Sequence, residues 1–203
     1  MTVIPFSSAC ERNKLPILTV LKEVLPARGK ILEIGSCTGQ HLVFFAPHFP
    51  GLHWQPSDRE ENLDGLTARL ELEASENVRR PLTLDVLKTW PTQKFDAVYS
   101  ANTAHIMSWD AVCAMFAGLE KLLIPGGPMC LYGPFNLHGR FSAESNRQFD
   151  RDLRERSPEM GLRDVDALES LALSHQMKLV KKYPLPANNE LLVFIRKQDP
   201  DNE

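Results

Sequence analysis

Residues 31–41, with the sequence ILEIGSCTGQH, constrain the fold of this chain more than any other segment. A short apolar run ends at Glu33, Gly35 and Gly39 bound a loop, and an amphipathic segment continues to Phe49. Glycines allow torsions and close approaches that a Cβ forbids, and the start of a following helix presents unpaired N–H groups. This order indicates the first strand–loop–helix unit of a nucleotide-binding α/β sheet.

The rest of the chain alternates apolar runs with segments of helical spacing. We expect helices over 10–25, 40–49, 60–74, 109–123 and 164–175, and strands over 30–34, 52–56, 81–84, 95–100, 129–132, 179–183 and 191–196. Such alternation predicts right-handed βαβ units, with helices on both faces of a parallel sheet. The ligand of such a sheet lies beyond the carboxyl ends of its strands, where the strand order reverses.

Composition excludes several other classes of protein. The 203 residues fit one domain, and no repeat or linker divides them. A net charge of −3 disfavours nucleic acid as a partner, since phosphates need basic neutralisation, and no apolar run approaches the roughly 20 residues of a membrane span. Four scattered cysteines without a C-x-x-C pair, and no basic region before an apolar stretch at the N-terminus, predict a cytoplasmic protein. The histidines show no zinc spacing, and no feature decides between a monomer and a homodimer.

The positions of the glycines separate the candidate cofactors. A dinucleotide loop, G-x-G-x-x-G, would place glycines where this chain has Cys37 and Gln40, so a nicotinamide oxidoreductase is disfavoured. A phosphate-binding Walker loop would need Gly-Lys-Ser/Thr, which does not follow. Asp58 ends the second predicted strand, where a carboxylate can accept hydrogen bonds from ribose hydroxyls, and Asp85 ends the third. One such acid is about as often a cap or a turn residue, but Glu33, Asp58 and Asp85 stand in three consecutive loops.

The pattern E-x-G-x-x-x-G over Glu33–Gly39 resembles motif I of class I S-adenosylmethionine-dependent methyltransferases. From about Arg12 to Arg196 the chain is most similar to the methyltransferase-like 26 family, a group predicted to bind S-adenosylmethionine. The segments that carry this resemblance are Glu11-Arg12-Asn13, Trp54-Gln55-Pro56-Ser57-Asp58, Leu84-Asp85-Val86, Asn102 with Ala104-His105, Tyr132-Gly133-Pro134, Ser145-Asn146 with Phe149-Asp150, Gly161-Leu162-Arg163-Asp164 and Pro186-Ala187-Asn188-Asn189. Two positions depart from it: Cys37 replaces the usual middle glycine of motif I, and Met160 stands where a tryptophan is expected.

The resemblance implies a Rossmann-like class I methyltransferase fold, with a mostly parallel seven-stranded sheet whose last strand is antiparallel. It implies S-adenosylmethionine as the cofactor and S-adenosylhomocysteine as the product. In such enzymes an acid at the position of Asp85 accepts from the adenine amino group, and the next N–H, here that of Val86, supports the ring. The implied cofactor-binding residues are Arg12, Asn13, Glu33, Gly35, Ser36, Gly39, Asp58, Asp85, Val86 and Asn102.

Methyl transfer is an in-line displacement, so the enzyme must hold the nucleophile and the methyl group in line and exclude water. A base is needed only where the nucleophile arrives protonated. His105 is the candidate base because its unperturbed pKa lies near neutrality, with capping or packing of the next helix as its structural alternative. The candidate substrate residues are Tyr132, Asn146, Arg163, Asn188 and Asn189.

Structural alternatives apply to several other residues. Arg12 could belong to a solvated helix start, and Asp164 could cap a helix. Asn188 and Asn189 suit a hairpin turn, since asparagine tolerates positive φ. A solvated helix face is the preferred interpretation for Arg147, Arg151 and Arg154.

We therefore expect a single methyltransferase domain over 1–203, with an N-terminal helical cap over 1–28 and a lid-like insertion over 134–162. The expected function is S-adenosylmethionine-dependent methylation of a small molecule, because little chain lies outside the core sheet to hold a macromolecule. The alternative is a cofactor-binding module without catalysis that serves as a partner subunit, which Cys37 in the glycine loop favours.

Overall fold

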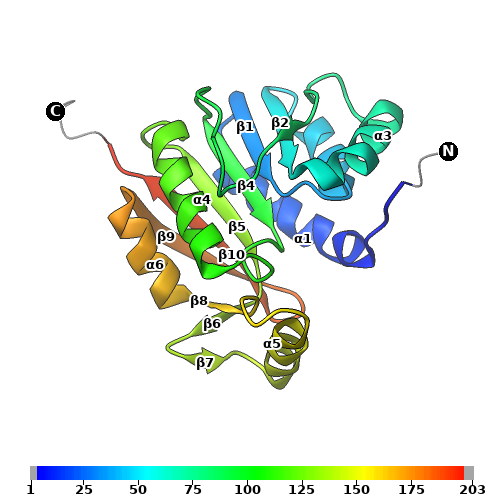
Figure 1. The fold of residues 1–203 in the computed structure, drawn as a ribbon. Helices are drawn as coiled ribbons and strands as arrows, with labels where there is room; N and C mark the ends of the chain where they lie inside the picture. The colour runs from blue at the N-terminus through cyan, green and yellow to red at the C-terminus, as the bar shows by residue number, and fades with distance from the viewer. Residues whose placement is uncertain (1–3, 199–203) are drawn as a thin grey trace.

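Seven strands form one twisted sheet through the centre of the molecule (Figure 1). Their order across the sheet is β3 (Leu82–Thr83), β2 (Leu52–Asp58), β1 (Gly29–Ile34), β4 (Ala97–Ala101), β5 (Pro128–Gly133), β10 (Asn189–Arg196) and β9 (Met177–Leu185). The computed structural model describes residues 4–198, so the ends of the predicted domain, 1–3 of its N-terminal cap and 199–203, lie outside the described residues.

The pairing of the strands confirms the predicted fold class. β1 pairs in parallel with β2 and β4, β2 with β3, and β4 with β5. β10, the last strand of the chain, is antiparallel to both of its neighbours, β5 and β9. The strand order reverses between β1 and β4, so a crevice is expected beyond Ile34 and Ala101, where these two strands end.

Helices cover both faces of the sheet (Figure 1). On one face α1 (Ser8–Val24) and α2 (Gln40–Phe45) pack in a buried cluster that includes Phe45 and Trp54. On the other face α4 (Trp109–Leu122) and α6 (Val165–Ser174) pack in a cluster that includes Phe116 and Phe194. Two apolar layers therefore hold the sheet in place.

Most expected elements are present, with differences at their ends. The helix expected over 40–49 is α2 followed by a 3₁₀ turn, η1 (Ala46–His48), which contains Pro47. The helix expected over 60–74 begins as a 3₁₀ turn, η2 (Glu60–Asn62), and continues as α3 (Leu63–Glu73). β2 is two residues longer than expected and includes Asp58.

A tryptophan fills the space beside α4 in the helix-free connection from β3 to β4. A Cβ on Gly118 of α4 would come within 2.1 Å of the Trp90 ring, so only glycine admits the ring there. The Trp90 Nε1 donates to the carbonyl of Val86 at 3.0 Å. This contact holds the loop that follows β3 against the core.

A small second layer lies beyond the carboxyl end of β5, at the lower end of the molecule in Figure 1. It contains a three-stranded sheet of β7 (Arg140–Phe141), β6 (Phe135–Leu137) and β8 (Arg163–Asp164), together with α5 (Glu144–Arg156). Most of it comes from the insertion expected over 134–162. Asp164 ends β8 and accepts a hydrogen bond from the N–H of Asp166, so it caps α6 as its structural alternative predicted.

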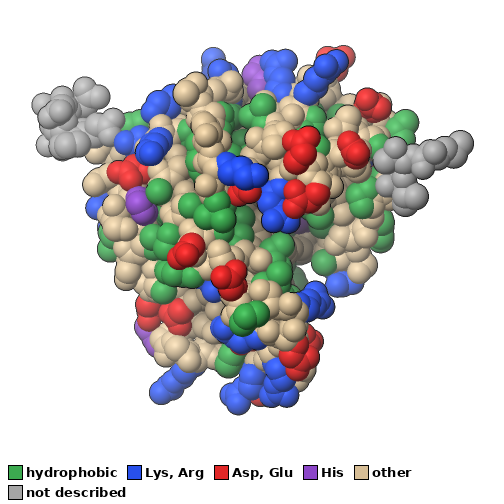
Figure 2. Space-filling model, in the orientation of Figure 1, with side chains coloured by type: hydrophobic (Ala, Val, Ile, Leu, Met, Phe, Trp, Pro, Cys, Tyr) green, Lys and Arg blue, Asp and Glu red, His purple; other side chains and the backbone are tan. Residues whose placement is uncertain are grey.

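Charged side chains of both signs are spread over the surface in Figure 2, and basic ones gather at its lower end, over β7 and α5. The arginines of these two elements, all exposed, are Arg140, Arg147, Arg151, Arg154 and Arg156. For Arg147 and Arg151 this agrees with a solvated helix face, whereas the Arg154 Nε donates to the buried Asp150 at 2.7 Å. Within residues 4–198 there is no helix with the length and apolar character that crossing a bilayer requires.

Candidate functional site

A cavity of about 710 Å³ opens at the carboxyl ends of β1, β2 and β4, where the strand order reverses. This volume suits a small ligand or cofactor. Eight of the predicted site residues line it: Glu33, Gly35, Ser36, Asp58, Asp85, Val86, Asn102 and His105. Residues from four separate strand ends therefore converge on one space.

The glycine loop has the backbone conformation that its sequence predicts. Gly35 and Gly39 have φ values of +74° and +70°, a region that side chains rarely adopt. A Cβ on Gly35 would lie 2.5 Å from the Thr103 side chain, and one on Gly39 would lie 2.9 Å from Leu66. Gly39 itself does not line the cavity, so its role is to let the loop pass beside α3. Cys37 also has a positive φ, +46°, which explains why this position suits glycine.

Glu33 lies beneath the loop, only 3% exposed. Its Oε2 accepts a hydrogen bond from the Ser36 hydroxyl at 2.7 Å. Burial raises the pKa of Glu33 to about 7, and the nearby charge of Asp58 adds to that rise while the Ser36 bond opposes it. The carboxyl group is therefore poised to change its charge near neutral pH.

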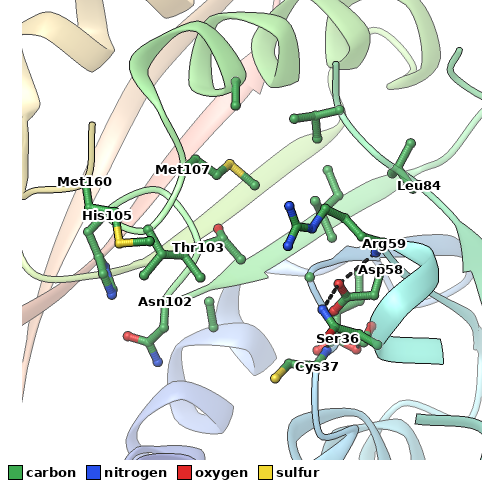
Figure 3. A pocket seen from close by; sticks show the side chains of 18 of the residues that line it. Ser36, Cys37, Asp58, Arg59, Leu84, Asn102, Thr103, His105, Met107 and Met160 are labelled. Atoms are coloured by element: carbon green, nitrogen blue, oxygen red, sulfur yellow. Dashed lines mark hydrogen bonds between the residues drawn. The ribbon is translucent and has the colours of Figure 1, made fainter. Parts of the chain in front are cut away.

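Asp58 joins the loop to the end of β2. Its Oδ2 accepts from the N–H of Cys37 at 2.6 Å, and its Oδ1 accepts from the N–H of Arg59 at 2.8 Å and from the Asn62 amide at 2.7 Å. Because an ionised carboxylate has about four lone-pair sites, one on Oδ2 remains for a ligand hydroxyl. Figure 3 shows Asp58, Ser36 and Cys37 together on one wall of the cavity.

Asp85 and Val86 stand at the neighbouring strand end. The Asp85 Oδ1 accepts from the N–H of Leu87 at 3.0 Å, and its Oδ2 lies 3.6 Å from the Lys88 Nζ. This turn closes the end of the cavity beside Leu84. A carboxylate and a backbone N–H side by side can pair with an amino group and a ring nitrogen.

The loop after β4 forms the opposite wall. Asn102 has φ of +58°, and its N–H donates to the carbonyl of Tyr132 at 2.9 Å. Thr103 shares a 2.7 Å hydrogen bond with the Ser100 hydroxyl, which in turn donates to the carbonyl of Ile34. These bonds fix the loop, and Figure 3 shows Asn102 and His105 on this wall with Met160.

His105 is 6% exposed and lines the cavity. Its ring packs edge-on against Phe149 of α5, with centroids 5.3 Å apart. Burial lowers the pKa of His105 to about 4, and the positive charge of Arg163 contributes to this shift. The imidazole is therefore neutral at physiological pH and can accept a proton only transiently. Ser108, not His105, caps α4.

Besides Gly39, two predicted cofactor residues, Arg12 and Asn13, lie outside the residues that line the cavity, and their roles stay predictions. Arg12 is exposed on α1. The Asn13 Oδ1 accepts from the Nε2–H of His41 at 2.6 Å, and the His41 Nδ1 accepts from the Tyr99 hydroxyl at 3.1 Å. Asn13 also hydrogen-bonds to Tyr132. This chain of buried and half-buried polar groups connects α1, α2, β4 and β5.

The five predicted substrate residues also lie outside the lining and make contacts within the protein. The Asn146 amide donates to the Ser142 hydroxyl at 2.8 Å and to the carbonyl of Asn188 at 3.0 Å. Asn188 has φ of +56° in the turn from β9 to β10, and the Asn189 amide donates to the carbonyl of Pro186. A substrate contact for these residues and for Tyr132 stays a prediction.

Arg163 holds the β4–α4 loop from behind. Its Nε donates to the carbonyl of Ala104 at 2.9 Å, and its Nη2 donates to the carbonyls of Met107 and Glu159. The guanidinium thus positions the loop that carries His105, and any direct contact with a substrate stays a prediction.

The N-terminal segment supplies lining residues that sequence reasoning missed: Ser7, Ala9 and Cys10. Two buried side chains hold this segment over the glycine loop. The Arg69 Nη2 donates to the carbonyl of Pro5 at 2.7 Å and its Nε to the carbonyl of Thr38 at 2.6 Å. Gln40 accepts from the N–H of Ser7 and donates to its carbonyl. One feature of the sequence could have indicated this contact. Gln40 is a polar residue at the start of the second helix, at the position where the dinucleotide pattern requires glycine.

Three apolar lining residues, Met107, Phe149 and Met160, also come from segments far apart in the chain. Two of them carried a sequence signal: Phe149 within a segment that shares the resemblance, and Met160 as a departure from it. Within residues 4–198 no three His, Cys, Asp or Glu side chains gather into a group that could hold a metal ion.

The strand order, the antiparallel last strand and the cavity at the strand reversal define a Rossmann-like fold of the class I methyltransferase type. The chain belongs to the family described as protein of unknown function DUF938, whose model matches residues 4–196.

Solved methyltransferases share this fold at low sequence identity. An O-methyltransferase family protein from Burkholderia thailandensis is 15% identical with a TM-score of 0.79, and the match covers 94% of this chain and 58% of that one. Human N-acetylserotonin methyltransferase, solved in complex with SAM, is 14% identical with a TM-score of 0.79, covering 94% and 53%. CalO1, a methyltransferase of calicheamicin biosynthesis solved with bound SAH, is 16% identical with a TM-score of 0.72, covering 91% and 54%. This chain therefore spans a little more than half the length of these proteins.

Proposed function

We propose that this protein is an S-adenosylmethionine-dependent methyltransferase that acts on a small-molecule acceptor. The observation that carries the proposal is the convergence of Glu33, Asp58 and Asp85, from three consecutive strand ends, on one cavity. Each acid was selected from the sequence for its place at a strand end. Three such groups matching the parts of one adenosyl cofactor are harder to explain as separate caps and turns.

The residues present fit S-adenosylmethionine in chemistry. The free lone pair of Asp58 suits a ribose hydroxyl, and Asp85 with the N–H of Val86 suits an adenine edge. The loop of Gly35 and Ser36, above the buried Glu33, would face the methionine part of the cofactor. When bound, the cofactor supplies an electrophilic methyl group on a sulfonium.

Three features of the chain suit methyl transfer. The N-terminal segment and α5 enclose the cavity and limit access of water. Asn102 and His105 come from one rigid loop, so groups bound to them keep a fixed orientation. Neutral His105 can accept a proton from a nucleophile that arrives protonated.

Two kinds of similarity support the proposal. The chain shares its fold with solved methyltransferases whose structures contain SAM or SAH. Its motifs also resemble the methyltransferase-like 26 family, and we propose that it is a member of that group. A single domain, a cytoplasmic location and the absence of nucleic-acid and membrane partners belong to the same proposal.

Calorimetry with S-adenosylhomocysteine tests the cofactor assignment. We expect binding in the micromolar range, and no binding at millimolar concentration would overturn the proposal. Transfer of a radiolabelled methyl group into a small-molecule extract then tests catalysis. Tight cofactor binding without transfer, together with co-purification of a partner protein, would instead support the non-catalytic module that Cys37 suggested.

A further inference from the structure

The acceptor end of the cavity has apolar walls. The loop before α4 contributes Ile106 and Met107, α5 contributes Phe149, and the segment after α5 contributes Met160. Figure 3 shows Met160 beside His105, with Met107 above them. Thioethers make favourable contacts with aromatic rings, as do aromatic edges. These walls therefore suit a flat apolar body.

No cation at this end of the cavity is available to pair with an anion. Among the lining residues that the structure describes, Arg59 alone is a permanent cation, and it stands beside Asp58 and pairs with Glu61 at 2.5 Å. Arg163 lies behind the wall, where backbone carbonyls occupy its guanidinium. A carboxylate or phosphate on the acceptor would therefore be desolvated without a partner.

Polar side chains also stand in these walls: Asn102 and His105 in the loop after β4, Ser108 before α4, and Ser157 and Glu159 after α5. The His105 ring is more than nine-tenths buried, lines the cavity and has no hydrogen-bond partner among the residues that the structure describes. The Asn102 side chain likewise lacks a partner within residues 4–198, and Figure 3 shows it on the same wall as His105. Buried polar groups of native proteins are almost always paired. The unpartnered His105 ring, with the half-buried Asn102 on the same wall, therefore points to a ligand that brings one polar group to a specific place.

We propose that the acceptor is an uncharged small molecule with a flat, apolar body and one hydroxyl group, which is methylated on its oxygen. The proposal rests on the proposed function and goes beyond it by naming the acceptor class. His105 accepts the hydroxyl proton, and Asn102 orients the oxygen. The oxygen forms a bond to the methyl carbon as the carbon–sulfur bond breaks. The electron pair of that bond stays on sulfur, giving S-adenosylhomocysteine, and the proton passes from His105 to water.

Matched acceptors of different charge test this inference. The probes are 2-naphthol, its 6-carboxylate and 2-(aminomethyl)naphthalene, each incubated with the full chain and S-adenosylmethionine. The readouts are S-adenosylhomocysteine release and mass spectrometry of the methylated product. We expect kcat/KM for 2-naphthol to exceed that for the carboxylate by at least about tenfold, because the carboxylate charge stays unpaired.

A charge placed on the wall sharpens the test. Met160→Lys would supply the missing cation and shift the ratio of kcat/KM values towards the carboxylate by at least about tenfold. Ile106→Lys, at the more exposed mouth, would give a smaller shift in the same direction. Val180→Lys is the matched control, since Val180 is an exposed residue of β9 outside the cavity lining, and it should leave the ratio unchanged.

Binding of S-adenosylhomocysteine to each variant reports whether its cofactor site is intact. If the wild-type protein does not bind S-adenosylhomocysteine, the proposed function itself fails. If it does bind, the acceptor inference is overturned by preference for the carboxylate, by methylation of the amine alone, or by failure of calorimetry to detect 2-naphthol binding to the cofactor-loaded protein. An unchanged preference in both lysine variants of the acceptor end would also overturn it.

Discussion

The carboxylate of Asp58 accepts a 2.6 Å hydrogen bond from the backbone N–H of Cys37, 21 residues earlier in the chain. The bond joins the end of β2 to the tip of the glycine loop, so one side chain both shapes the loop and faces the cavity. The bond therefore connects the two sequence positions that distinguished an adenosyl cofactor from a dinucleotide. These are Asp58, the acid after the second strand, and Cys37, which replaces the middle glycine.

Replacing Asp58 with asparagine tests the first of these positions. Asp58→Asn keeps the size of the side chain but removes the charge that accepts hydrogen bonds, so we expect S-adenosylhomocysteine affinity to fall by at least about tenfold. Calorimetry measures the change. Glu61→Gln is the control, since it removes a similar charge from an exposed residue outside the cavity lining. Equal affinities for the two variants would contradict a role for Asp58 in cofactor binding.

Cys37 holds a backbone conformation that suits glycine, and its variants should separate strain from chemistry. A β-branched side chain at a positive φ is strongly disfavoured, so Cys37→Val should lower the free energy of unfolding by about 1–3 kcal/mol. In Cys37→Gly, relief of backbone strain stabilises the folded state, while the greater freedom of glycine stabilises the unfolded chain. These two effects oppose each other, so the free energy of unfolding should change by no more than about 1 kcal/mol. Urea denaturation measures both.

Cys113→Val is the control for that comparison, because Cys113 lies within the right-handed helix α4. Its effect should be under about 1 kcal/mol, the range of helix propensities. Equal losses for valine at positions 37 and 113 would show that the backbone at Cys37 carries no strain.

The strand-end acids were predictable because their position follows from local sequence. An apolar run that ends in an acid or is followed by one fixes Glu33, Asp58 and Asp85 at one edge of a parallel sheet, whatever the details of packing. The strand order and the antiparallel β10 agreed with the family resemblance for a similar reason, since the alternation of elements restricts the topology.

The remaining lining residues depend on contacts between distant parts of the chain. Pro5 is held by Arg69, 64 residues away, so no local pattern marks the N-terminal segment as a wall of the cavity. Tyr132 packs with the α1 side of the sheet, and Arg163 is occupied by three carbonyls. The sequence places both near the site, but the direction of a side chain and its partners are decided by packing.

Acidification should destabilise the protein through its two buried histidines. The pKa values of His41 and His105 are both lowered to about 4 by burial. Between about pH 6.5 and 4 the unfolded state therefore binds more protons at these positions, and stability falls as pH falls. Glu33 acts in the opposite sense, since its pKa of about 7 lets the folded state hold a proton that the unfolded state has released.

Variants can separate two of these groups, His105 and Glu33. A difference of one bound proton between the folded and unfolded states changes the free energy of unfolding by about 1.4 kcal/mol per pH unit. His105→Phe keeps an aromatic ring against Phe149 and should flatten the fall between pH 6.5 and 5 by about that slope. Glu33→Gln should steepen it by a similar amount. Urea denaturation at each pH measures the slopes, and parallel profiles for wild type and both variants would refute the assignment.

Asn13 distinguishes a structural role from a role in cofactor binding. In Asn13→Ala the Nε2 of the buried His41 loses its partner, whereas Tyr132 keeps its hydrogen bond to Asn189. One unsatisfied buried group lowers stability by about 1–3 kcal/mol, so we expect the free energy of unfolding to fall by that amount. Because Asn13 lies outside the cavity lining, S-adenosylhomocysteine affinity should change by less than about threefold, which is under 1 kcal/mol.

Thr19→Ala, on the exposed side of α1, controls for loss of a polar side chain from this helix. Intact stability with a large loss of affinity would instead support the direct cofactor contact that the family resemblance implies, and Arg12→Ala would then show whether its neighbour shares that role.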